Sequence, residues 1–171
     1  NPSGVYFARG SSVDVGGLVA TTHSISNDAF MAGSNSFSRN GSTGTVQNDG
    51  TLNAALGGYI ALLAPTVRNQ GVVVAKLGTV AMAAGETFNL QIEGGRTLTG
   101  LEVTASTVAS LVDNGLAVQA PGGLIILSAQ ALDRVQGGVV NNSGVLQANG
   151  LVNDGGRIML RASSKISHTG S

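Results

Sequence analysis

The sequence has no cysteine and few charged or aromatic residues. Without cysteine among 171 residues, disulfide bonds, thiolate metal sites and cysteine nucleophiles are excluded. Charged residues make up 11% of the chain, and nine basic residues balance nine acidic ones. A nucleic-acid binder of this size usually shows a basic excess, so we expect no nucleic-acid partner.

Long apolar runs are also missing. Stretches such as 59–65 and 124–127 are far shorter than the roughly 18–20 residues that a membrane-spanning helix needs, and nothing resembles a signal peptide. The chain opens on Asn1-Pro2-Ser3-Gly4 without an initiator methionine, so we interpret it as a piece of a longer precursor. Its length predicts one domain over residues 1–171.

Two motifs recur along the chain. The first, V-x-N-x-G-x-[LV]-x-A, starts at Val46, Val67 and Val140. The second, G-x-[IV]-x-[LM]-x-A, starts at Gly58, Gly78, Gly123 and Gly156. A degraded copy of the first motif runs from Val112 through Asn114-Gly115 to Ala120, and we interpret it as shifted by one residue. Such self-similarity is the sequence signature of a repeat architecture.

Both motifs alternate with a period of two, which predicts strands with aliphatic residues on one face. A unit of about 20 residues is too short for a βαβ unit, which needs roughly 30 or more, and it suits the stacked coils of a parallel β-helix. One continuous core is therefore predicted, and it is formed by Ile60, Leu62, Val80, Met82, Ile125, Leu127, Ile158 and Leu160. Asn48, Asn69 and Asn142 share one repeat position, which predicts an amide ladder inside or at a corner of the coils.

The spacing of the second motif breaks between Ala84 and Gly123. Apolar residues alternate from Phe88 to Ile92 and again from Leu98 to Val103, which predicts a β-hairpin outside the tube within an excursion over 86–111. A short helical turn is expected at 107–111. The region 24–44 is rich in serine, asparagine and glycine, and we expect a loop there.

These repeats, together with Asn1-Pro2-Ser3-Gly4-Val5 and the segment 13–22 (VDVGGLVATT), resemble the amino-terminal secretion domain of two-partner secretion exoproteins of the filamentous haemagglutinin type. The resemblance covers essentially the whole chain. It implies a right-handed parallel β-helix (solenoid) with an extra-helical β-hairpin. Ser3 stands where that family usually has asparagine. The family's upstream cap and earlier N-P-N-L motif do not occur in this sequence, which fits the interpretation as a fragment.

The resemblance also implies a function. A domain of this kind directs a large surface exoprotein, such as an adhesin, to a partner outer-membrane barrel transporter with periplasmic binding domains, and it then seeds folding of the β-helix. Asn1, Pro2, Ser3 and Gly4 would form the transporter-recognition element. The protein would reach the surface or medium of a Gram-negative bacterium after passing the periplasm. Turn statistics alone favour a second interpretation of these four residues, a type I turn that only starts a coil.

Two other functions stay open, an adhesive rod that binds glycans or host surfaces, and a carbohydrate-active β-helix enzyme. The enzyme requires carboxylates gathered on one outer face, whereas Asp49, Asp113 and Asp154 each stand at an expected coil corner, where aspartate usually forms turns. His23 and His168 have no partner at metal-ligand spacing, and we expect both on the surface. No catalytic residue, metal or cofactor is predicted.

Overall fold

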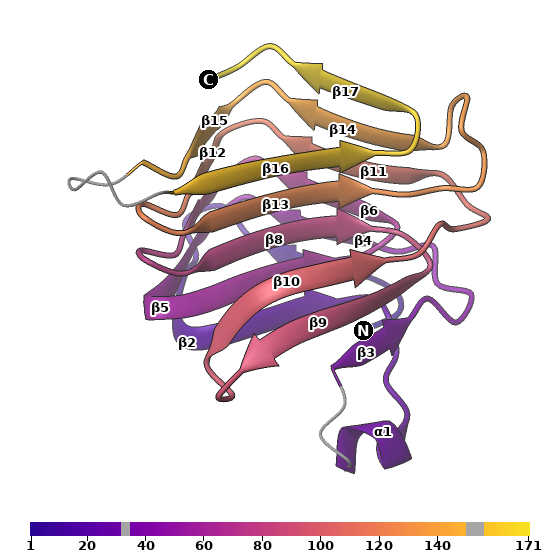
Figure 1. Cartoon of the computed structure of the whole chain (residues 1–171), viewed down its shortest axis with the longest axis horizontal. Coiled ribbons are helices and arrows are strands. Elements are labelled where there is room, and N and C mark those ends of the chain that lie inside the picture. The colour runs from indigo at the N-terminus through magenta and orange to yellow at the C-terminus, as the bar shows by residue number, and fades with distance from the viewer. Residues whose placement is uncertain (32–34, 150–155) are drawn as a thin grey trace.

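The chain winds into three-sided coils that stack along one axis in the computed structural model, which describes residues 1–31, 35–149 and 156–171 (Figure 1). The first side of the coils is a six-stranded parallel sheet. In order, its strands are β1 (Val5–Phe7), β4 (Thr45–Asn48), β6 (Thr66–Asn69), β11 (Ser110–Asn114), β14 (Gly138–Asn142) and β17 (Lys165–His168). The predicted parallel β-helix is confirmed.

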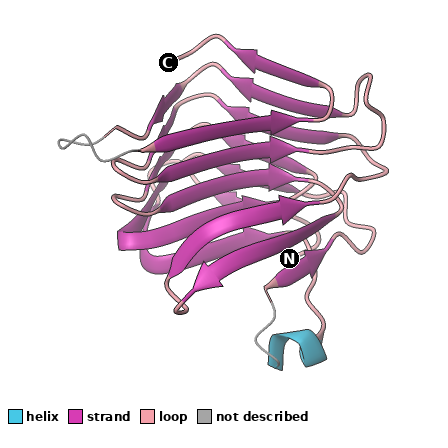
Figure 2. Ribbon diagram, viewed as in Figure 1, coloured by secondary structure: helices cyan, strands magenta, loops and turns pink. Residues whose placement is uncertain are grey.

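The other two sides share two long strands that bend around a corner, β2 (Ser12–Thr21) and β5 (Thr51–Leu63). A narrow side continues with β7 (Val72–Val74), β12 (Ala117–Gln119) and β15 (Val145–Gln147). A broad side continues with β8 (Thr79–Ala84), β13 (Leu124–Ala129) and β16 (Arg157–Ala162). All of these strands pair in parallel (Figure 2).

The second motif forms the broad side, and its register explains the core. Val80, Ile125 and Ile158 are directly aligned on β8, β13 and β16. Six of the eight predicted core residues are fully buried, namely Ile60, Leu62, Val80, Met82, Ile125 and Leu127. Leu160 is partly buried and packs against them. The prediction for Ile158 is wrong, because it is 43% exposed on β16, which is the outermost strand of its sheet in the described part of the chain.

The second motif starts with glycine because neighbouring coils approach each other closely at that point. A Cβ atom on Gly78 would collide with the carbonyl oxygen of Gly58 on the preceding coil, and one on Gly123 would collide with that of Gly78. Any side chain there would push two coils apart. The glycine is therefore a requirement of stacking.

The degraded first motif is not shifted, contrary to our interpretation. Asn114 is aligned with Asn69 on β6, and Val118 with Val73 on β7, so the polar and apolar positions keep the register of the other coils. Only the glycine differs, because Gly115 comes one position earlier than the glycine of the other copies. Leu116 stands at the position that is glycine in those copies, and it is 49% exposed.

The predicted asparagine ladder is present, and it is longer than expected. The Nδ2 atom of Asn48 donates to Oδ1 of Asn69 at 3.0 Å, Asn69 to Asn114 at 2.9 Å, and Asn114 to Asn142 at 2.8 Å. All four amides are buried. The series ends at His168, whose Nδ1 atom lies 2.9 Å from Nδ2 of Asn142. Because buried amides must be hydrogen-bonded, the ladder fixes coil register as well as filling the corner.

A second, smaller sheet lies against the outside of the coils. Strands β9 (Thr87–Glu93) and β10 (Thr97–Val103) form an antiparallel hairpin, and β3 (Ser36–Ser38) pairs with β9 to give the order β10-β9-β3. The short helix α1 (Asn27–Met31) precedes β3. The loop expected at 24–44 therefore contributes a strand. No helical turn forms at 107–111, because β11 begins at Ser110 and rejoins the coils.

This extra-helical sheet covers the broad side of the coils instead of projecting from it (Figure 1). Buried residues from both layers make a second core, namely Ala61, Leu63, Ala81, Ala83, Phe88, Leu90, Leu98, Leu124 and Ile126. The coil residues of this set occupy alternate positions of the second motif, so their side chains face outward. On β5, β8 and β13 the broad side thus carries buried apolar residues on both faces, and the outer ones pack against the extra-helical sheet.

Candidate functional site

The four residues Asn1, Pro2, Ser3 and Gly4 form a turn at the start of the first coil. The amide of Gly4 donates to the carbonyl oxygen of Asn1 at 3.2 Å, and the amide of Ser3 donates to Oδ1 of Asn1 at 3.1 Å. Asn1, Pro2 and Ser3 are exposed. The backbone of Gly4 has a φ of 138°, a value that L-residues rarely adopt, so glycine is required there. The turn is thus exposed at its first three residues, while its backbone is hydrogen-bonded within the fold.

The segment 42–44 anchors this turn to the coils. The hydroxyl of Ser42 donates to the carbonyl oxygen of Pro2 at 2.7 Å, and Gly44 lies so close that a Cβ atom on it would be 2.8 Å from the same oxygen. The turn is consequently held in one place by residues about 40 positions away. A held, exposed turn is suited to recognition, because binding costs little further conformational entropy.

A shallow groove of about 380 Å³ begins at the turn and follows β1. Tyr6, which is 61% exposed, lines it, and its hydroxyl donates to Oδ2 of Asp49 at 2.7 Å. This hydrogen bond lowers the pKa of Asp49 and raises that of Tyr6. Gln47 also donates to Asp49, at 3.0 Å, which lowers the pKa of the carboxyl further. Asp49 therefore orders the groove and is not a free acid.

The remaining aspartates do not gather into a catalytic pair. Asp113 lies within β11, one position before the corner at which we expected it, and pairs with Arg68 at 3.4 Å. Asp49 is on a different coil and is engaged by Tyr6. Asp154 lies outside the described residues. Within the described ranges, no cluster of three or more histidine, cysteine, aspartate or glutamate side chains could hold a metal ion.

The prediction that both histidines are on the surface holds for His168 and is wrong for His23. His23 is 5% exposed, its Nε2 atom lies 3.0 Å from the carbonyl oxygen of Gly85, and its ring is 4.4 Å from that of Phe88. Because a carbonyl oxygen only accepts, Nε2 carries the proton. Burial lowers the pKa of His23, although the hydrogen bond to Gly85 opposes this. Sequence alone gave no sign of this burial, which depends on the docked hairpin.

An ion pair beside His23 closes the base of the hairpin. Nε of Arg39 donates to Oε1 of Glu86 at 2.9 Å, and the hydroxyl of Ser106 donates to the same oxygen at 2.8 Å. Burial acts to raise the pKa of Glu86, but these hydrogen bonds outweigh it, and the pKa falls below its usual value. The pair joins the loop before β4 to both ends of the hairpin. Its role is structural, because both charges are used within the fold.

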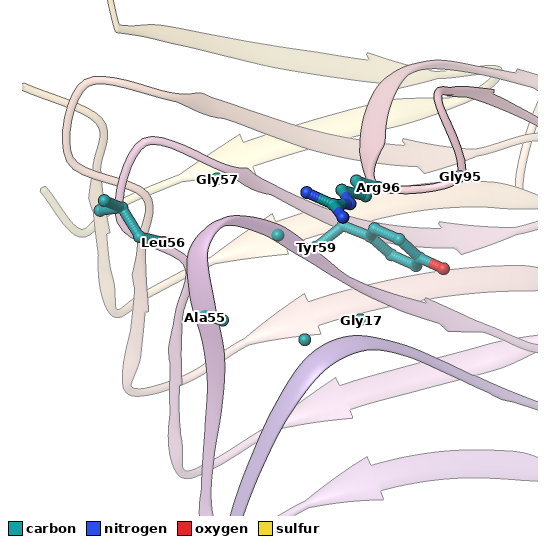
Figure 3. Close-up of a pocket in the computed structure, with 9 residues that line it drawn as sticks. Gly17, Ala55, Leu56, Gly57, Tyr59, Gly95 and Arg96 are labelled. Atoms are coloured by element: carbon teal, nitrogen blue, oxygen red, sulfur yellow. The ribbon is translucent and has the colours of Figure 1, made fainter.

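A cavity of about 420 Å³ lies between the corner of β2 and β5 and the tip of the hairpin (Figure 3). Glycines form much of its wall, and Tyr59 and Arg96 supply its larger side chains. The Tyr59 ring lies over Gly17, where a Cβ atom would be 2.7 Å from the ring. No carboxylate lines this cavity, so it does not provide the acid pair of a glycosidase.

These features define a class of protein, a β-helix that presents a fixed exposed turn and a covered side and has no clustered acids on its described surface. A sequence comparison identifies the particular family. The model of the TPS secretion domain matches residues 1–171, and the chain therefore belongs to the TPS secretion domain family. It is the secretion domain of a two-partner secretion exoprotein, which crosses the outer membrane of a Gram-negative bacterium to the cell surface or the medium.

Comparison of folds agrees with this assignment. The crystal structure of the HMW1 secretion domain from Haemophilus influenzae superposes with a TM-score of 0.86 at 21% sequence identity. The match covers 99% of this chain and 44% of that one, so the chain spans less than half of its length. Comparison with curated protein sequences gives no match. None of the described helices is long and apolar enough to cross a membrane.

Proposed function

We propose that this domain is recognised by a partner outer-membrane barrel transporter, through the turn formed by Asn1, Pro2, Ser3 and Gly4. The observation that carries the proposal is the geometry of the turn. Its first three residues are exposed, yet the hydrogen bonds from Gly4 to Asn1 and from Ser42 to Pro2 hold its backbone in one conformation. The groove beside Tyr6 extends the same surface. Periplasmic binding domains of the transporter would contact this surface before export.

The rest of the fold suits export through a pore. A chain without cysteine crosses without disulfides to reduce, and coils that contact only their neighbours can fold one after another as they emerge. The asparagine ladder gives each new coil a hydrogen-bonding template in the coil before it. We propose that residues 1–171 act as one secretion domain, with the excursion over 86–111 as a part of it that docks on the coils.

This role requires binding rather than catalysis, and we propose that the domain is not an enzyme. A second candidate function, glycan binding by the outer surface, is supported by the cavity that Tyr59 and Arg96 line. An aromatic ring and a guanidinium group would suit a sugar that carries an acidic group. Loss of sugar binding on changing both residues to alanine, measured by calorimetry, would be the test.

If the turn is recognised by the transporter, a change in the turn should reduce export much more than it reduces the stability of the domain. Changing Asn1 and Pro2 to alanine removes one exposed turn, so the free energy of unfolding should fall by about 1 kcal/mol or less. Export of the full exoprotein through its transporter should fall sharply. The measurements are extracellular yield in cells and the denaturant midpoint of the purified domain.

The chain offers a matched control in Asp133. Its Oδ1 atom accepts from the amides of Val135 and Gln136 at 3.0 and 3.3 Å, so Asp133→Ala removes a similar side-chain-to-backbone turn far from the motif. This variant should be exported normally. If the two variants lose export in parallel with their stability, the motif is only a corner, and recognition must be sought on the outward residues of the early coil from Val13 to Thr22.

A further inference from the structure

The extra-helical sheet leaves one part of the broad side uncovered. Its edge strand is β10, and among the strands that the structure describes β10 pairs with β9 alone. Beyond the other edge of β10 lie β13 and β16, which Figure 1 shows side by side and in full view. A second layer of strands therefore stops partway across the coils. In the described part of the chain its outer edge has no strand partner, although the carbonyl oxygen of Leu98 accepts from the hydroxyl of Thr79 at 2.7 Å.

Two adjoining cavities form a groove along this edge. Each has a volume of about 330 Å³, and both are lined by Leu101, Glu102, Ile126 and Arg161. The floor is apolar, with Ile126 buried and Met159 half-buried. One wall is the strand β10. The other is β16, so the groove runs between a strand edge and an exposed sheet face.

The outward side chains of β16 give the groove a charge pattern. Arg157, Met159 and Arg161 share this face, because Leu160, at an alternate position of the strand, packs against the coil core, whereas Met159 packs against the second core. Both arginines are exposed, and within the described ranges neither forms an ion pair. Four residues of a strand span about 13 Å, so two positive charges flank an apolar centre at that separation.

We propose that this groove binds an extended peptide, which adds to the edge of β10 as a further strand. Its inward side chains would be acidic, apolar and acidic at every second position, opposite Arg157, Met159 and Arg161. Main-chain hydrogen bonds to β10 would supply affinity, and the two carboxylates would set the register. The positions between them would be neutral or basic, because Glu102, which accepts from Gln91 at 3.3 Å, lies on the outer face of β10.

Arg157, Met159 and Arg161 lie at every second position of β16, which matches the spacing of the side chains on one face of a peptide strand. This match favours a peptide over a small anion. A phosphate or single carboxylate would engage one arginine and leave the apolar floor and the β10 edge unused. A peptide strand uses all three features at once. The surface is separate from the turn at Asn1, so the proposal does not depend on how the transporter recognises the domain.

A labelled peptide tests the proposal directly. The probe has seven residues, with glutamate at the second and sixth positions, valine at the fourth and threonine elsewhere. Fluorescence anisotropy should show saturable binding to the domain, and NMR shifts should concentrate in β10, β13 and β16. Changing Arg157 and Arg161 together to glutamate should weaken binding at least tenfold. Arg134→Glu, a matched change on an exposed loop, should leave binding unchanged.

Three further peptides separate strand addition from simple charge attraction. A peptide with lysine in place of both glutamates should bind the doubly reversed variant and not the original domain. In the other two peptides, the backbone nitrogens of one edge or of the opposite edge are methylated. Only one edge of an added strand hydrogen-bonds to β10, so one of these two peptides should lose binding and the other should keep it. Binding that tolerates methylation of both edges, or no saturation at millimolar peptide, would overturn the proposal.

Discussion

The coil core and the extra-helical core are built by different rules. In the coils, each aliphatic side chain stacks on its equivalent one coil away, as Val80 does on Ile125, and the pairing is parallel and repetitive. The extra-helical sheet has no repeat. It is antiparallel, and its largest buried side chain, Phe88, packs on the outward residues of the coils. Coil stability is therefore shared along the rod, whereas the extra-helical sheet depends on one docking surface.

The largest effect should come from the coil core. Leu127 is fully buried at the centre of the stack, so Leu127→Ala should lower the free energy of unfolding by about 2–5 kcal/mol. Leu132→Ala is the control, because Leu132 is 64% exposed and its truncation should cost about 0.5 kcal/mol or less. Denaturant unfolding measures both. Equal, small costs for the two variants would remove Leu127 from the core.

A smaller and more local effect is expected for Phe88→Ala. The side chain is fully buried, but the coils can remain stacked when the hairpin loosens, so the measured loss should be about 1–3 kcal/mol. Hydrogen exchange should accelerate in β3, β9 and β10 and stay slow in β13. Uniform acceleration in both regions would show that the two cores unfold as one unit and would break the comparison.

The smallest effect concerns His23, which lies where the two cores meet. Its pKa is lowered by burial, so the unfolded state takes up a proton first as the pH falls below about 6.5. Stability is thus fully present above this pH and declines as the pH decreases. His23→Gln keeps a donor for Gly85 without titrating, so unfolding free energies between pH 5 and 7.5 should depend less on pH. At pH 7.5 the substitution should cost about 1 kcal/mol or less.

The original protein, measured over the same pH range, is the reference for that series. An unchanged profile for His23→Gln would mean that protonation of His23 does not oppose folding.

The two cores also differ in how far the sequence predicts them. The coils were predictable because every second position of the motifs is aliphatic, and a period of two admits only one inward face. The outward positions Ala61, Leu63 and Ile126 are apolar as well, and this was an available signal that a second layer covers them. The pairing of Phe37 with Phe88 was not predictable, since a three-residue strand carries too little pattern to fix a distant partner.

The candidate site was predictable only in part. The turn at Asn1 follows from local residue preferences, as its hydrogen bond to Gly4 shows. Its anchor, Ser42, comes from a region without any pattern, and the burial of His23 appears only once the hairpin is docked. The prediction for Ile158 failed although its motif is intact. Its strand, β16, is outermost in the described part of its sheet, so no further described strand covers it.

Partner-dependent export is the most direct test of the central claim, that residues 1–171 are a secretion domain. The full exoprotein should be produced in cells with its transporter, in cells without it, and in a form that lacks residues 1–171, and the extracellular yield should be measured in each. Substantial export is expected only for the intact exoprotein produced with the transporter. Equal export without the transporter, or normal export of the form that lacks the domain, would contradict it.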